Sequence, residues 1–121
     1  IRRLAAQQHF IFSINYHSSR SGNHAEKVHY SFEWNGGKTC PDFDVTQYVG
    51  NSVAALIDNE AGTGHYESSP SLSRRGHAHD WFYQAHGTIQ LLIECGTENI
   101  QPNNNPPLYL VDDTCQRNSV G

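Results

Sequence analysis

Two chemically active side chains each stand where an apolar run of the sequence stops. The run over residues 9–16 (HFIFSINY) ends at His17, and the run over residues 88–93 ends at Glu94. A neutral imidazole is a good zinc ligand, and a carboxylate that is not a ligand can take the proton from a zinc-bound water, whose pKa is lowered to about 7. The two residues together predict metal-assisted hydrolysis, provided that the fold brings them side by side.

The hydrophobic pattern predicts the elements that would position this pair. Residues 9–16 carry apolar side chains on both faces, which indicates a strand mostly covered on both sides, and residues 88–93 form a second predicted strand. Between them, Asp44 as N-cap and apolar residues at i, i+3 and i+4 spacing predict a helix over residues 44–61. This order predicts an α/β fold with a largely parallel or mixed sheet and helices on both faces. Ligands bind at the carboxyl ends of strands in such sheets, so the two strand-end residues are expected to be neighbours.

The remaining segments are predicted to be mostly loops. Residues 1–8 show helical spacing, residues 18–40 indicate an irregular loop or short hairpin, and residues 65–79 indicate a polar loop. A final helix is expected near residues 108–115. Because the sequence starts inside a predicted helix and contains no methionine, we expect a partial or processed chain.

Composition excludes several classes of protein. A chain of 121 residues suits one compact unit, and its net charge of −4 with scattered Lys and Arg disfavours nucleic acid as a partner. No apolar run approaches the roughly 20 residues of a bilayer helix, so no membrane association is expected. The three cysteines have no Cys-x-x-Cys spacing, which indicates neither a disulfide scaffold nor a thiolate zinc site.

The chain resembles the C-terminal half of the zinc metallocarboxypeptidase family, which is typified by pancreatic carboxypeptidase. His17-Ser18 matches the position of the family's third zinc ligand, and Asp80-Trp81 followed by Glu94 is similar to the block that carries its general base. The resemblance implies that residues 1–121 are the C-terminal portion of one catalytic domain with a partial carboxypeptidase-like fold. It further implies Zn²⁺ as cofactor, hydrolysis of the C-terminal residue of a peptide or peptide-like substrate, and an extracellular or periplasmic location.

The same resemblance assigns residues to the substrate cleft. In the family, the residue just before the Asp-Trp pair lies in the specificity pocket, and here it is His79, next to Asp80. The family's mobile tyrosine would fall at Leu72, so either Tyr66 replaces it from a rearranged loop or the role is vacant. Ser19 stands where the usual pattern has a tyrosine.

Other parts of the family pattern are missing from the sequence. The His-x-x-Glu motif that supplies two zinc ligands does not occur, and the family's carboxylate-binding arginine also belongs to the N-terminal half. A stable zinc site needs about three protein ligands, and His17 is one. The N-terminal half of the domain is therefore an expected partner.

Two other functions are open. His77-Ala78-His79 could belong to a cupin-like metal site in a jelly roll, although the following glutamate is misplaced and the predicted helix has no place there. The plainer interpretation of this pair is two histidines on a solvated loop. A carboxypeptidase-like domain that has lost catalysis and acts as a binding module is the non-enzyme alternative.

Overall fold

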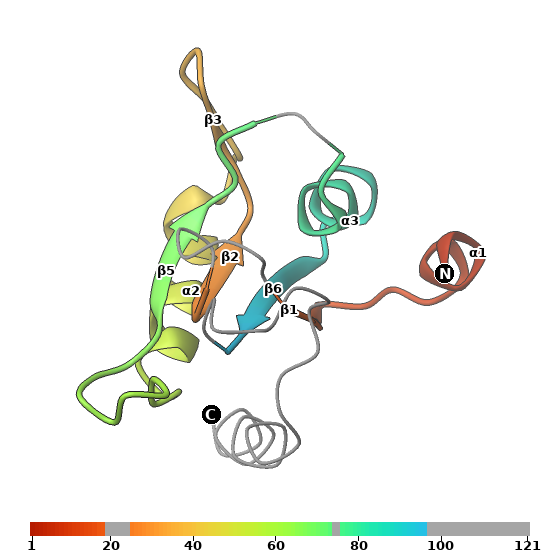
Figure 1. Ribbon diagram of the computed structural model, residues 1–121. Helices are drawn as coiled ribbons and strands as arrows, with labels where there is room; N and C mark the ends of the chain where they lie inside the picture. Colours follow the sequence, from red (N-terminus) through yellow and green to blue (C-terminus); the bar gives the residue numbers. More distant parts are fainter. Residues whose placement is uncertain (19–24, 74–75, 97–121) are drawn as a thin grey trace.

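The computed structural model describes residues 1–18, 25–73 and 76–96, which form a small α/β structure (Figure 1). A four-stranded mixed sheet has the order β1-β6-β2-β5, and β3 and β4 form a separate two-stranded hairpin. The strands of the larger sheet are β1 (Phe12–Ser18), β2 (Lys27–Tyr30), β5 (Glu67–Pro70) and β6 (Ile89–Cys95). The hairpin strands are β3 (Glu33–Trp34) and β4 (Lys38–Thr39), and the helices are α1 (Arg2–Gln7), α2 (Phe43–Ala54) and α3 (Ala78–His86).

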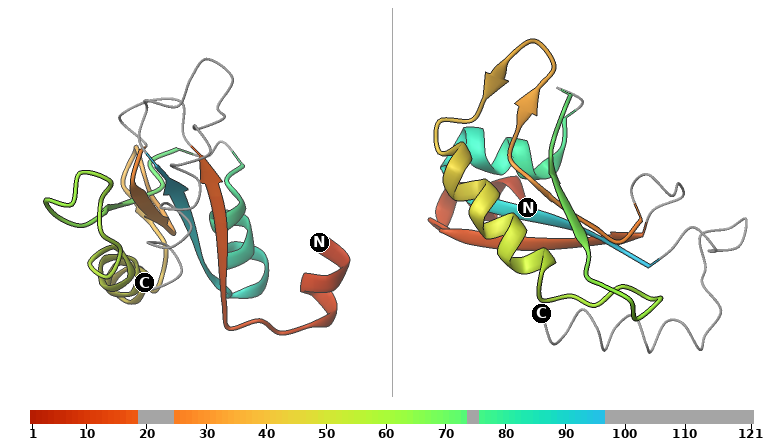
Figure 2. Two further views of the ribbon diagram at one scale, coloured as in Figure 1. Left: turned by 60° about the horizontal axis from the view of Figure 1, so that its bottom comes forward. Right: turned by 90° about the vertical axis from the view of Figure 1, so that its left-hand side faces the viewer.

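The two strands predicted from the apolar runs are neighbours and run parallel, as Figure 2 shows for β1 and β6. β2 and β5 are also parallel, but β2 runs antiparallel to β6, so the sheet is mixed. Helices pack on both faces: α2 lies against β2 and β5, and α3 lies against β6. The predicted α/β class is confirmed, and the sheet is not the jelly roll that a cupin-like site would need.

The prediction that β1 is covered on both sides is wrong. β1 is the edge strand of the described sheet, and Phe12, Ile14 and Tyr16 are 41%, 42% and 53% exposed. They share a face with Leu91 and Ile93 of β6, which are buried. The reason is the position of α2, which packs over β2 and β5 and, among the described elements, leaves this end of the sheet face uncovered.

The helix predicted over residues 44–61 is shorter in the structure. α2 has Asp42 as its N-cap, so Asp44 lies in the first turn instead of capping the helix. The helix ends at Ala54 instead of near residue 61, and backbone N–H groups of the next turn bond three residues back, which tightens the end. Its buried positions include Gly50 and Ala54, small residues that let the helix approach the sheet closely.

Regular structure also occurs where loops were predicted. The segment 65–79 contains β5 and the first two residues of α3, and the segment 18–40 contains β2 and a short hairpin. α3 ends at His86 and is followed by Gly87, whose φ of 67° is the left-handed conformation that glycine adopts without steric cost. The helix expected near residues 108–115 lies outside the described residues. None of the described helices is long and apolar enough to cross a bilayer.

Two clusters form the core. The larger one joins α2 to the sheet. The smaller one joins the β3–β4 hairpin region to α3, where the Tyr83 ring contacts Phe32 edge-on with 6.3 Å between centroids. The larger cluster contains Val28, Tyr30, Ala54, Ile57, Tyr66, Leu91 and Ile93. The larger cluster therefore holds α2 against the sheet, and the smaller one holds α3 against the hairpin region.

Replacing Gly50 by alanine is expected to destabilise the fold by about 1–3 kcal/mol, because the new methyl group overpacks the α2–β2 contact. A Cβ at Gly50 would lie 2.5 Å from Cδ1 and 3.1 Å from Cγ of the Tyr30 ring. Urea unfolding followed by circular dichroism measures the change. Gly64→Ala is the matched control, since its nearest neighbour would be 3.6 Å away. A Gly50→Ala protein as stable as the wild type would contradict this close packing.

Candidate functional site

His17 and Glu94 meet at the carboxyl ends of β1 and β6. The two residues are partners in the parallel register, and His17 Nδ1 lies 3.0 Å from Glu94 Oε2, within hydrogen-bond distance. The sequence prediction that these side chains are neighbours is confirmed. The contact depends on the parallel register, because a shift of one residue would turn one of the two side chains to the opposite face of the sheet.

The two side chains differ sharply in solvent exposure. The His17 side chain is 65% exposed on the edge strand, whereas the Glu94 side chain is 11% exposed because β6 lies between β1 and β2. On its other side, Glu94 has Lys27 of β2 as its register partner, and the Lys27 ammonium pairs with Glu67 at 3.3 Å. An accessible imidazole in front of a largely buried carboxylate can offer one metal ligand and one proton acceptor at the same place.

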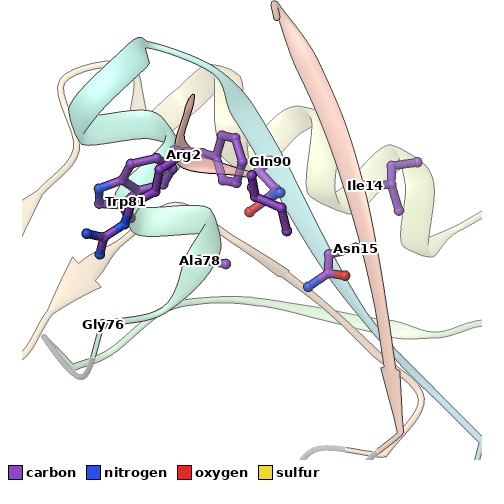
Figure 3. Close-up of a pocket in the computed structure, with 9 residues that line it drawn as sticks. Arg2, Ile14, Asn15, Gly76, Ala78, Trp81 and Gln90 are labelled. Carbon is purple, nitrogen blue, oxygen red and sulfur yellow. The ribbon is translucent and has the colours of Figure 1, made fainter. Parts of the chain in front are cut away.

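A pocket of about 460 Å³ lies on the α3 side of the sheet (Figure 3). Its lining includes Asn15 of β1, Ala78, Trp81 and Phe82 of α3, and Gln90 of β6. Asn15 is two residues before His17, so the two side chains point to the same face of β1. Gln90 Oε1 is buried and has no hydrogen-bond partner among the described residues. A pocket of this size, with a few polar groups among aromatic ones, can accommodate a small ligand.

The residues assigned to the substrate cleft lie in different environments. Leu72 is exposed, whereas Tyr66 is buried in the larger core cluster and its hydroxyl accepts a hydrogen bond from the Gly96 N–H at 3.3 Å. His79 and Asp80 are both buried in the first turn of α3. The structure therefore brings His17 to Glu94 and His79 to Asp80, but it buries the candidate replacement for the mobile tyrosine.

The interpretation of His77 and His79 as histidines on a solvated loop is wrong for His79. Its ring is 2% exposed, because residues 78–86 form a helix that packs on β6. Burial lowers the pKa of His79 to about 3, with further lowering by the nearby His77 and His29. His79 is therefore neutral at physiological pH.

Asp80 is held by two residues that sequence reasoning did not identify. Its Oδ2 accepts hydrogen bonds from Trp34 Nε1 at 3.1 Å and from Ser71 Oγ at 2.7 Å. Burial raises the pKa of Asp80, and these two hydrogen bonds and the nearby His77 oppose that rise. Trp34 is 46 residues away in the sequence, and no local pattern indicates the contact.

Among the described residues, the only group of three or more potential metal ligands is His77, His79 and Asp80. One ligand atom from each of the three lies within 4.8 Å of the others. His17 and Glu94 have no third ligand of this kind in the described part of the chain. The structure therefore contains two separate sets of residues that could interact with a metal.

No protein-family model matches the chain, and no curated protein is a significant match to it.

Proposed function

We propose that the chain is the C-terminal portion of a zinc metallocarboxypeptidase catalytic domain, with His17 as a zinc ligand and Glu94 as the general base. The observation that carries the proposal is the 3.0 Å contact between these side chains at adjacent carboxyl ends of parallel strands. Ligand sites of open α/β sheets lie at such strand ends. A location outside the cytoplasm is part of the same proposal.

His17 is a suitable type of ligand for zinc, but a catalytic zinc site needs more protein ligands than this one residue. A neutral imidazole is a common zinc ligand, and catalytic zinc sites have three protein ligands. His17 supplies one of them, so we propose that the other two come from the N-terminal half of the domain. When bound, the metal would polarise the scissile carbonyl and acidify a water molecule.

Glu94 has the position and surroundings that a general base needs. Its carboxylate lies beside the exposed imidazole, where it can accept the proton of the attacking water and pass it to the departing amine. Its low exposure keeps competing bulk water away from the carboxylate. The pocket on the same side of the sheet would receive part of the peptide substrate.

The loss-of-catalysis alternative has one specific observation in its favour. Leu72, at the position of the family's mobile tyrosine, has no hydroxyl, and Tyr66 is buried in the core. A domain with an intact His17–Glu94 pair but no closing tyrosine could bind peptides without cleaving them.

Assays on the full-length protein that contains this chain separate these functions. The zinc-loaded enzyme is expected to release single residues from peptides with a free C-terminal carboxylate and to leave the matching C-terminal amides intact. Chelation with 1,10-phenanthroline should abolish the release, and added zinc should restore it. Mass spectrometry of the shortened peptides is the readout. Peptide binding by the zinc-loaded protein without any release would favour the binding module.

A further inference from the structure

We propose that His77, His79 and Asp80 form a second metal site, distinct from the His17–Glu94 pair, that binds one divalent transition-metal ion such as Zn²⁺. The three residues are nearly consecutive at the start of α3, and one ligand atom from each lies within 4.8 Å of the others. Two imidazoles and a carboxylate are a donor set that zinc accepts, with solvent as a fourth ligand.

The first line of support is a set of buried polar atoms without partners. Both ring nitrogens of His79 and Oδ1 of Asp80 are buried and make no hydrogen bond to any described residue. Unpaired buried polar atoms are costly, so each such group in a folded protein calls for an explanation. A metal ion bound between His79 and Asp80 would satisfy one nitrogen and the carboxylate oxygen together.

The second line of support is the spacing of these atoms. His79 Nε2 and Asp80 Oδ1 are 3.8 Å apart, which is too long for a hydrogen bond. Two ligands of a tetrahedral zinc ion, each about 2.0–2.2 Å from the metal, are about 3.3–3.6 Å apart. A small side-chain rotation would therefore convert this contact into a pair of metal ligands.

The third line of support is the hydrogen bonding around the cluster. Ser71 Oγ donates to Asp80 Oδ2 at 2.7 Å and also lies 2.7 Å from His77 Nδ1. The hydroxyl has a single hydrogen, so when it donates to Asp80, His77 Nδ1 carries the proton and donates to Ser71. This tautomer leaves the lone pair on Nε2, so His77 would bind a metal through that nitrogen and not through Nδ1, which lies 3.9 Å from Asp80 Oδ2. Metal-binding histidines are typically oriented by such a hydrogen bond from the other ring nitrogen.

The surroundings of the three proposed ligands allow a metal ion to enter, and the ligand types determine which ion binds. The His77 side chain is 38% exposed, which gives an ion and its bound water a route to the cluster. A helix N-terminus disfavours cations, and the carboxylate of Asp80 in the first turn offsets this effect. Imidazole ligands select Zn²⁺, Co²⁺ or Ni²⁺ over Mg²⁺ and Ca²⁺, which prefer oxygen donors.

Titration of the purified, metal-stripped protein with Co²⁺ tests the site, because bound Co²⁺ gives visible absorption bands that Zn²⁺ then removes by competition. The His17→Ala variant is used as the background, so that the result does not depend on the proposed catalytic site. We expect one saturable Co²⁺ per chain in that background and no competition by excess Mg²⁺. Saturable binding should disappear in His17→Ala/His77→Ala.

Two further variants make the test specific. Ser71→Ala should weaken binding by about 10–100-fold, because it removes the group that orients His77 and Asp80. His65→Ala is the control. His65 is an exposed histidine that pairs with Asp58 at 3.0 Å, and it is not one of the three proposed ligands. Circular dichroism confirms that each variant is folded. Absence of saturable Co²⁺ binding in the His17→Ala background, or binding that survives both His77→Ala and Ser71→Ala, would overturn the proposal.

Discussion

Replacing Glu94 by glutamine in the full-length protein is expected, on the proposed function, to lower kcat at least about a hundredfold while zinc content stays unchanged. A positioned general base contributes roughly two to four orders of magnitude, and an amide has the shape of the carboxylate but cannot accept the proton. Steady-state kinetics and metal analysis on the same preparation measure the two quantities. Glu33→Gln is the matched control, because Glu33 is exposed on the separate β3–β4 hairpin, whereas Glu67 pairs with Lys27, the register partner of Glu94.

The same substitution separates two roles that the geometry allows for Glu94. Its Oε2 lies 3.0 Å from His17 Nδ1, so the carboxylate could also act by orienting the imidazole. A glutamine at this position still accepts a hydrogen bond from Nδ1 through its amide oxygen, so an orienting role would largely survive. Near-normal kcat and zinc content in Glu94→Gln would therefore rule out the base role and identify Glu94 as a positioning residue.

The pairing of His17 with Glu94 could be predicted from the sequence because each residue's place at the end of a strand is visible in its neighbouring residues. Each residue closes an apolar run, and two adjacent parallel strands place such ends together. The solvent exposure of β1 could not be predicted in the same way. Alternating apolar residues show that a strand has an apolar face, but which face a helix covers depends on where α2 docks, and that is decided by contacts with β2 and β5.

The missed elements have weak local signals. β5 (ESSP) contains two serines and a proline, which have little preference for strands, and its pairing with β2 holds it in the sheet. α3 (AHDWFYQAH) carries two histidines, an aspartate and aromatic residues of modest helix propensity, and packing against β6 stabilises it. The grouping of His77, His79 and Asp80 depends on this helix, because its packing against β6 buries His79 next to Asp80.

Replacing His17 by alanine in the full-length protein is expected, on the proposed function, to reduce bound zinc and activity together. Removing one of three protein ligands weakens the metal site itself, whereas Glu94→Gln leaves all ligands in place. The side chain is 65% exposed, so its loss should change the free energy of unfolding far less than the loss of a core residue would. Zinc content measured after dialysis, together with kcat/KM, gives the primary readout.

Excess zinc provides the decisive arm of this experiment. If His17 is a ligand and two other ligands remain, saturating zinc should restore part of the activity of His17→Ala, but it should restore none to Glu94→Gln, which is already loaded. His65→Ala, which removes another exposed histidine paired with a carboxylate at 3.0 Å, is expected to behave as wild type. A His17→Ala enzyme that keeps its full zinc complement would show that the imidazole at the end of β1 is not a ligand, and the His17–Glu94 contact would then be a surface hydrogen bond without a catalytic role.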